Sequence, residues 1–389
     1  MIVIRGHILE LKPNNKQATY FKKACGVARL AYNWALAEWQ KQYQADKNYR
    51  DNCLAKNLPI DESKLNKPTQ GKLRKQLNAI KRTQFPFMLE VTKCSPQLAI
   101  MQLGDAFKRF FKGENGYPQF RKKGLNDRFS LSNDQFKLKL KKDKPYIQIP
   151  NLGLVKMREH LLYQGKILSA KVFTKGGKWF VSIAVELDNN TQAKQLKTGN
   201  AVGIDLGITD LATLSTGEKI QAPKPLKNKL KKLQRLSKQF SRKQKGSKNR
   251  EKAKTKLSRL HYQISCIRKD FLHKLSTNLV KKFDVICLEN LNVKGMVKNK
   301  RLSRAISDLG FYEFKRQLIY KANQQGKRVR ELDRFYPSSK TCSCCGFKLQ
   351  DLPLNIRNWQ CPTCHTEHDR DINASINILH QADKVLTLF

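Results

Sequence analysis

Two carboxylates lie in segments that otherwise have the composition of buried strands. Asp205 stands between Ile204 and Leu206, and Glu289 ends the apolar run Val285–Leu288. A buried carboxylate without a compensating cation has a large desolvation cost, and a divalent metal is the usual compensation where phosphate is handled. Both residues are therefore candidate ligands of a hard ion such as Mg²⁺, which prefers carboxylate oxygens. Either one, taken alone, could instead face solvent or pair with a lysine.

A third candidate carboxylate lies near the C-terminal end of the chain. Asp371 comes directly before a helix expected over residues 373–386, so it could simply cap that helix. Asp369, two residues earlier, is a rival metal ligand. A pair of metal ions held by such carboxylates can activate a water and stabilise the leaving oxygen of a phosphodiester. The residue types predict phosphodiester hydrolysis and leave Asp369 and Asp371 as alternatives.

Four cysteines have the spacing of a structural zinc site. Cys342 and Cys345 form one C-x-x-C pair, and Cys361 and Cys364 form another about 15 residues later. Cys344 is expected to be a spectator or a local alternative ligand, and a redox role is the alternative for the cluster. A Zn²⁺ ion bound by four thiolates has no open position, so we expect a structural role. The remaining cysteines are scattered and are expected to be small core residues: Cys25, Cys53, Cys94, Cys266 and Cys287.

The charge of the chain predicts a polyanionic partner. Lys and Arg total 77 against 31 Asp and Glu, a net charge of +46, which exceeds what solubility requires. We find no apolar run long enough to span a bilayer and no signal peptide, so nucleic acid is expected rather than a membrane. Clustered thiols without a secretion signal favour a reducing cytoplasm. Residues 224–259 contain Glu251 as their only acidic residue and predict a basic helical hairpin that tracks phosphates, although a solvated face is the alternative.

The elements expected in the first half are strands and basic helices. Residues 1–11 predict a strand, residues 13–127 a basic helical unit, and residues 128–187 a series of short strands that form a small antiparallel barrel. Gly176 and Gly177 mark a hairpin within that series. The first strand could join the barrel, which would make the helical unit an insertion.

The second half is expected to alternate between strands and helices. A polar linker covers residues 188–200, and apolar strands then surround Asp205 and Glu289. A single helix is predicted over Ser307–Gln325, followed by a strand at Arg328–Leu332. The carboxylates would then be carried by strands and by the start of the last helix.

Taken in order, these motifs resemble the transposon-encoded TnpB family, compact RNA-guided nucleases related to the type V CRISPR effectors. Gly203–Asp210 is similar to the first RuvC-type motif of the family, Leu288–Leu291 to the second, and Asp369–Ala374 to the third. The segment Thr341–Cys364 resembles the zinc ribbon between the second and third motifs. Two further segments match, Ala106–Phe120 and Arg268–Leu275, so the resemblance covers nearly the whole chain.

The resemblance implies a fold class with α/β, β-barrel and helical parts. It implies an RNase H-like (RuvC) nuclease domain with an inserted zinc ribbon, preceded by a wedge-type β-barrel that a helical recognition domain interrupts. The implied boundaries are 1–12 and 128–187 for the wedge barrel, 13–127 for the recognition domain, 188–200 for the linker, 201–335 and 366–389 for the nuclease domain, and 336–365 for the ribbon.

The resemblance also implies which residues act. It selects Asp371 over Asp369, so Asp205, Glu289 and Asp371 would be the catalytic ligands of one or two Mg²⁺ ions. Cys342, Cys345, Cys361 and Cys364 would hold structural Zn²⁺. All three acidic positions are occupied, so nothing indicates an inactive relative.

The activity implied by the resemblance is an Mg-dependent, RNA-guided cut in double-stranded DNA. The target would be complementary to a bound guide RNA and next to a short adjacent motif, with pairing supplying sequence specificity. The expected location is the cytoplasm, on the nucleoid when DNA is bound. Three alternatives stay open: a guide-independent nuclease acting on junctions or flaps, a non-catalytic nucleic-acid-binding regulator of transposition, and a DNA-strand-transferring transposase.

Overall fold

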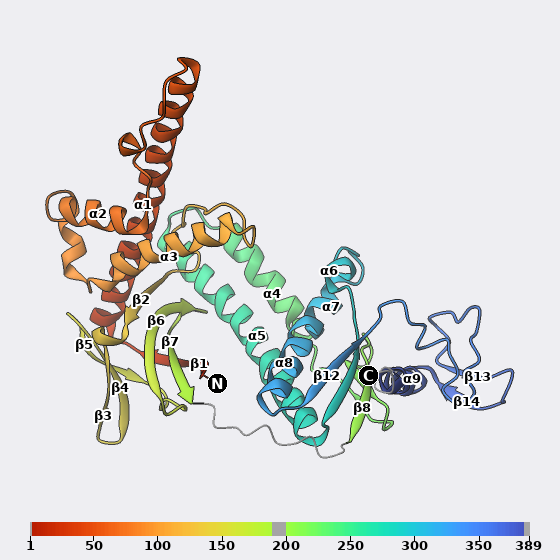
Figure 1. Cartoon of the computed structure of the whole chain (residues 1–389). Helices are drawn as coiled ribbons and strands as arrows, with labels where there is room; N and C mark the ends of the chain where they lie inside the picture. The colour runs from red at the N-terminus through yellow and green to blue at the C-terminus, as the bar shows by residue number, and fades with distance from the viewer. Residues whose placement is uncertain (1, 189–199, 385–389) are drawn as a thin grey trace. The chain divides into compact units, whose positions relative to one another are not determined.

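The computed structural model describes residues 2–188 and 200–384 (Figure 1). The chain forms two compact units, Met1–Asn190 and Thr191–Phe389, each with a hydrophobic core of its own. Most of the polar linker expected at residues 188–200 lies outside the described residues. Within the described ranges, no helix combines the length and the apolar composition needed to cross a membrane.

An antiparallel sheet of seven strands forms the base of the N-terminal unit. Its order is β2-β6-β7-β1-β5-β4-β3. Strand β1 pairs with β7 from Ile2↔Asp188 to Leu11↔Trp179 and then with β5, so the first strand lies inside the sheet. The hydrogen bonds between described residues leave β2 and β3 at the edges, and closure into a barrel stays a prediction. The bounds are β1 Ile2–Lys12, β2 Arg128–Ser132, β3 Lys137–Lys141, β4 Lys144–Ile149, β5 Gly153–Met157, β6 Lys166–Lys175 and β7 Lys178–Asp188.

Three main helices come between β1 and β2. They are α1 (Asn15–Ala55), α2 (Gln70–Gln84) and α3 (Cys94–Phe111). A capping box between Asn14 and Gln17 starts α1, because each side chain accepts from the backbone N–H of the other residue. Phe21 of α1 is fully buried and lies against the rings of Phe129 and Trp179, which belong to the sheet. The buried face of α1 therefore packs on the sheet.

A mixed sheet of five strands forms the centre of the C-terminal unit, in the order β10-β9-β8-β11-β12. Strands β8, β11 and β12 are parallel, and β9 is antiparallel to both β8 and β10. The apolar runs that predicted strands around the two carboxylates are confirmed as β8 and β11. The bounds are β8 Ala201–Asp205, β9 Ala212–Leu214, β10 Lys219–Ile220, β11 Val285–Glu289 and β12 Arg328–Leu332.

One helix predicted for this unit is divided into two in the structure. The single helix expected over Ser307–Gln325 is wrong, since the segment contains two helices separated by Gly310. Gly310 has φ 75°, a left-handed conformation that ends α7 and that glycine adopts without steric cost. The bounds are α4 Pro225–Ser241, α5 Lys248–Lys282, α6 Val293–Met296, α7 Ser303–Leu309, α8 Phe311–Gln324 and α9 Arg370–Lys384.

The two faces of this sheet are covered by different helices. Val202, Ile204 and Leu288 belong to the core that α5, α7 and α8 form on one face. Side chains alternate along a strand, so Gly203 and Cys287 face the opposite side, where Cys287 packs with Ile378 of α9. A Cβ at Gly203 would lie 2.0 Å from the carbonyl oxygen of Ser375, so only glycine lets α9 approach β8 this closely.

Candidate active site and metal centre

Asp205 and Glu289 lie at the ends of neighbouring parallel strands. Asp205 is the last residue of β8 and Glu289 the last of β11, and the residues before them are paired as Ile204↔Leu288. The two-residue period places both carboxylates on the side of Gly203, which is the side covered by α9. Both are half-buried. The structure therefore brings two of the three predicted carboxylates to one edge of the sheet.

Asp371 belongs to the same electrostatic site. The pKa of Asp205 lies well above its ordinary value, because Asp205 is desolvated by burial and because Glu289 and Asp371 are negative neighbours. Burial also raises the pKa of Glu289, and a hydrogen bond from Ser338 opposes that rise. A bound cation would stabilise the charged form of Asp205 against these two negative neighbours.

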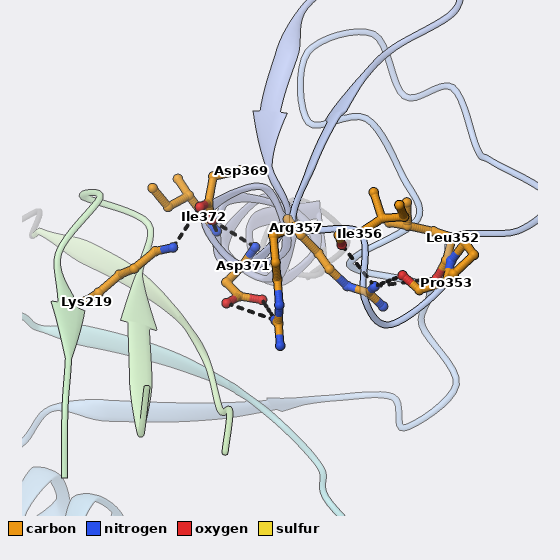
Figure 2. A network of polar contacts seen from close by, with 9 residues as sticks. Lys219, Leu352, Pro353, Ile356, Arg357, Asp369, Asp371 and Ile372 are labelled. Atoms are coloured by element: carbon orange, nitrogen blue, oxygen red, sulfur yellow. Dashed lines mark hydrogen bonds and ion pairs between the residues drawn. The ribbon is translucent and has the colours of Figure 1, made fainter. Parts of the chain in front are cut away.

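Asp369, and not Asp371, caps the last helix. Helix α9 begins at Arg370, so the expectation that Asp371 precedes the helix is wrong. Oδ1 of Asp369 accepts from the backbone N–H groups of Asp371 and Ile372, at 3.1 and 3.0 Å. Its Oδ2 pairs with Lys219 Nζ at 2.7 Å (Figure 2). Asp369 is thus occupied by structural contacts, and the side chain of Asp371 is left to face the site.

Arg357 contacts the candidate site from the cysteine-rich segment. Its Nη1 lies 3.2 Å from Oδ1 of Asp371, and Figure 2 shows the two side chains facing one another. Arg370 donates to the carbonyl oxygen of Pro353 at 2.7 Å, which ties the first turn of α9 to the same segment. Sequence reasoning missed Arg357, because nothing local distinguishes it among 77 cationic residues.

The same segment also contacts Glu289. Ser338 donates its hydroxyl hydrogen to Oε1 of Glu289 at 2.7 Å. Asn377 of α9 donates to the carbonyl oxygens of Ser338 and Thr341, at 2.8 and 2.6 Å, and Asn373 donates to Thr341 at 2.8 Å. The beginning of the cysteine-rich segment is therefore held on α9, and one hydroxyl from it orients a candidate metal ligand.

Four thiols form a compact cluster. The Sγ atoms of Cys342, Cys345, Cys361 and Cys364 all lie within 4.8 Å of one another, and Cys344 is exposed and outside the group. Such a donor set suits a tetrahedral Zn²⁺ ion. Among the scattered cysteines, Cys25, Cys53, Cys94 and Cys287 are buried as predicted, whereas Cys266 is only partly buried.

The cluster is close in sequence to the candidate active site. Nε2 of His368 lies 3.0 Å from Sγ of Cys342, and its ring packs against Trp359. His368 belongs to β14 (Glu367–Asp369), which pairs with β13 (Asn358–Gln360). Only Asp369 and Arg370 separate this histidine from Asp371, so the thiol cluster and the carboxylates share one short strand and helix start.

The carboxylates are spaced more widely than the thiols. Across residues 2–188 and 200–384, the cysteine cluster is the only group of three or more His, Cys, Asp or Glu residues whose ligand atoms lie within 4.8 Å of one another. A hard ion such as Mg²⁺ keeps several water ligands and is bound through one or two carboxylates rather than a closed protein cage. The three carboxylates offer oxygen ligands, and their negative charges repel one another, so they suit a bound Mg²⁺ ion.

Comparisons with known proteins cover most of the chain. A family described as "Probable transposase" matches residues 182–300, and "Cas12f1-like, TNB domain" matches residues 311–378. A protein of Streptomyces pristinaespiralis named "Putative RNA-guided DNA endonuclease" is 35% identical over 94% of this chain and 86% of its own. The chain belongs to the TnpB family. A second relative, "Putative RNA-guided DNA endonuclease InsQ" of Escherichia coli, is 30% identical over 97% of this chain and 92% of its own.

The TnpB membership predicted from the motifs is therefore confirmed. A solved structure titled "Cryo-EM structure of the Cas12f1-sgRNA-target DNA complex" has a TM-score of 0.57 at 14% identity, covering 94% of this TnpB chain and 83% of its own. That likeness concerns the fold alone. A "Helix-turn-helix domain" family also matches residues 1–48, but over residues 2–48 the structure has β1 followed by the uninterrupted start of α1.

Proposed function

We propose that this chain is an RNA-guided, Mg²⁺-dependent DNA endonuclease. Asp205, Glu289 and Asp371 would hold the metal, and the cut would fall in DNA complementary to a bound guide RNA, next to a short adjacent motif. The observation that carries the proposal is the shared site of three carboxylates, two on neighbouring parallel strands and one on the helix that covers them. Relatives named as RNA-guided DNA endonucleases over nearly the full length support the same activity.

The chemistry of the site follows from its residues. Mg²⁺ bound there, as one or two ions, would supply an activated water and charge stabilisation for the leaving oxygen. Glu289 is held in orientation by Ser338 Oγ at 2.7 Å. Asp371 is fixed by the first turn of α9, which Asp369 caps. Arg357 lies 3.2 Å from Asp371 and brings a guanidinium to the place where a phosphate would approach.

The finer fold assignment is part of the same proposal. The C-terminal unit would be a RuvC-type, RNase H-like domain at residues 201–335 and 366–389, with a zinc ribbon at 336–365. The mixed sheet and the thiol cluster support it. The N-terminal unit would comprise a wedge-type barrel at 1–12 and 128–187 and a recognition domain at 13–127.

Helices α4 and α5 would form the surface that holds nucleic acid phosphates. The helical hairpin predicted from the basic run is confirmed, with Ser247 capping α5 through Arg250 N–H at 3.1 Å. Buried Asp308 accepts from the backbone N–H groups of Leu226 and Lys227, both at 3.0 Å, and so fixes the start of α4. Asp308 is thus occupied by structural contacts at the start of the hairpin, and the many lysines of α4 and α5 would be free to meet phosphates.

The test is cleavage by the full chain purified with its co-expressed RNA. Asp205→Asn, Glu289→Gln and Asp371→Asn should each lower the cleavage rate at least about 1,000-fold, since removing one ligand disables a cooperative site. Binding of RNA should change less than about twofold, because the basic surface is untouched. Glu251→Gln, on α5, is the control and should cut normally. Full cutting by Asp205→Asn contradicts the assignment.

A second measurement separates the guided activity from its alternatives. The RNA that copurifies should contain a segment whose sequence determines which DNA is cut. Cutting that ignores the RNA sequence would favour a guide-independent nuclease, and joined rather than cut transposon ends would favour a strand-transferring transposase. The relatives' names and the occupied acidic triad favour neither alternative, nor a non-catalytic regulator.

A further inference from the structure

A groove of about 750 Å³ opens beside Glu289 in the C-terminal unit. Its lining comes from the end of β11, from α6 and from α8, and most of it is apolar. Tyr312 is 69% exposed and Val297 is 40% exposed, so the groove presents an aromatic ring and an aliphatic side chain to solvent. A volume of this size is typical of pockets that bind small molecules or single residues of a polymer.

Cations border the apolar surface. Four of the lining residues are positively charged, namely Lys294, Lys315, Arg316 and Arg334. Glu289 is the only acidic residue in the lining. Arg316 is held in place by two 2.8 Å hydrogen bonds to Glu313. Lys294 is exposed and forms no ion pair with any residue in the described part of the chain. The groove therefore suits a ligand that has both a flat apolar face and negative charge.

A nucleotide of a single strand has both properties. Its base can stack on an aromatic ring, and its phosphate can pair with lysine or arginine, without regard to sequence. A base inside a duplex is covered by its neighbours and paired with the other strand, so it cannot reach a protein ring unless it is extruded. The groove thus distinguishes an unpaired strand from a duplex.

We propose that this groove binds one unpaired nucleotide of the DNA strand that is cut. The base stacks on Tyr312, and the phosphate faces Lys294 and Arg316. The proposal rests on the nuclease function proposed above, because Glu289 is one of the residues that line the groove. Tyr312 is then a positioning residue that fixes which phosphate of an opened strand reaches the carboxylates.

Stacking can be measured without cleavage. The probe is a short single-stranded oligonucleotide containing 2-aminopurine, titrated into the full chain with its co-expressed RNA and with Asp371→Asn to prevent cutting. Binding should quench the fluorescence. Tyr312→Ala should remove the quenching and weaken binding about 10-fold, and Tyr312→Leu should do the same, because leucine packs but cannot stack. Tyr312→Phe should retain both.

Matched controls define the site. Phe335 is 86% exposed and lines a different groove of the same unit, so Phe335→Ala should change neither quenching nor affinity. Lys294→Ala should reduce the salt dependence of binding by about one phosphate contact. Lys298→Ala, at a nearby exposed lysine outside the lining, should not. A 2-aminopurine duplex should show no quenching by the protein.

The outcomes separate the two proposals. Unchanged quenching and affinity in both Tyr312→Ala and Tyr312→Leu would overturn the groove assignment and leave the nuclease assignment intact. Normal cutting by Asp205→Asn would overturn the nuclease assignment, while the fluorescence result would still report on the groove. An equal loss of quenching and affinity in Phe335→Ala and Tyr312→Ala would also overturn the groove assignment. It would show that the strand binds without a specific site at Tyr312.

Discussion

Nη1 of Arg357 lies 3.2 Å from Oδ1 of Asp371, so a cation from the cysteine-rich segment contacts one of the three carboxylates of the candidate site. The side chain of Arg357 is 56% exposed, whereas that of Asp371 is 21% exposed. The guanidinium can therefore leave for solvent or for a phosphate while the carboxylate stays in place. Arg357 and a metal ion bound at the proposed site would compete for the same negative charge.

Arg357→Gln should lower the Mg²⁺ concentration needed for half-maximal cleavage. An exposed ion pair is worth about 0–1 kcal/mol, which corresponds to a shift of up to about fivefold. The maximal rate should fall, because the guanidinium near the phosphate is lost. Cleavage rates across a Mg²⁺ titration give both quantities. Lys348→Ala, at an exposed lysine elsewhere in the segment, should leave the titration unchanged, and a higher Mg²⁺ requirement in Arg357→Gln would contradict competition.

Asp369 and Asp371 should respond differently to the same substitution. Asp369→Asn keeps an oxygen that accepts the helix N–H groups and loses only the ion pair with Lys219, so cleavage should stay within a few-fold of the original. Asp369→Ala loses the cap as well and should lower the free energy of unfolding by about 1 kcal/mol. Asp371→Asn should abolish cleavage without that loss of stability. Equal cleavage defects in the two asparagine variants would show that Asp369 is also a ligand.

Gly203→Ala should destabilise the C-terminal unit and slow cleavage together. The new Cβ would meet Ser375 O at 2.0 Å and Leu379 N at 2.7 Å, both backbone atoms that cannot rotate away. Displacing α9 should cost about 1–3 kcal/mol of unfolding free energy and would move Asp371. Gly6→Ala is the matched control in another strand, because its nearest neighbour would be Ser182 Oγ at 3.9 Å. Chemical denaturation and cleavage rates measure both effects.

Removing zinc should lower activity because the cysteine-rich segment loses its fold, and not because zinc takes part in the reaction. The purified chain should contain one zinc per molecule, and Cys361→Ser should lose it while Cys344→Ser keeps it. Without the metal, protease should cut within residues 340–366, and cleavage of DNA should fall because Ser338 and Arg357 lose their support. Zinc content, proteolysis and activity are measured on the same samples. Full activity of zinc-free protein would show that the segment does not orient the carboxylates.

Glu313 should make stability depend on pH at the acid end. Hydrogen bonds from Arg316 and Gln317 lower the pKa of Glu313 to about 2, below its unfolded value. Because the folded pKa is the lower one, the stabilisation is fully present above pH 4.5 and is lost as the pH falls toward 2. Arg316 is half exposed, so solvent screening limits the effect to about 1 kcal/mol.

The check on Glu313 is a comparison of two proteins over pH. The difference in unfolding free energy between the original chain and Glu313→Gln, from urea denaturation, should be constant between about pH 5.5 and 7 and should shrink below about pH 4.5. Glu218→Gln, at an exposed turn residue, should show no such trend. A difference that grows on acidification would contradict the assigned pKa.

Local patterns in the sequence predicted much of the fold. The apolar runs around Asp205 and Glu289 gave two neighbouring strands, because a strand buried on both faces needs apolar residues at every position. The spacing of the two C-x-x-C pairs correctly predicted which four thiols form the cluster. Gly310 was missed because helical spacing continues on both sides of it, and only its backbone conformation shows that the helix ends there.

The contacts around the carboxylates could not be predicted from the sequence. Ser338 and Arg357 reach Glu289 and Asp371 from positions 49 and 14 residues away along the chain. Such contacts depend on how α9 holds the cysteine-rich segment. This tertiary arrangement cannot be inferred from the spacing of apolar residues. The sequence also did not show which aspartate caps α9. Asp369 and Asp371 are two positions apart, and either could cap a helix that starts in this region.

Lys219 and Arg357 place two positive charges beside the carboxylates of a chain with a net charge of +46. A protein with such a potential repels divalent cations and attracts anions. Bound nucleic acid would reverse that potential and would draw Mg²⁺ toward the site together with its phosphates. Metal loading would then be an ion exchange driven by the substrate, and the free protein would stay idle even where Mg²⁺ is plentiful.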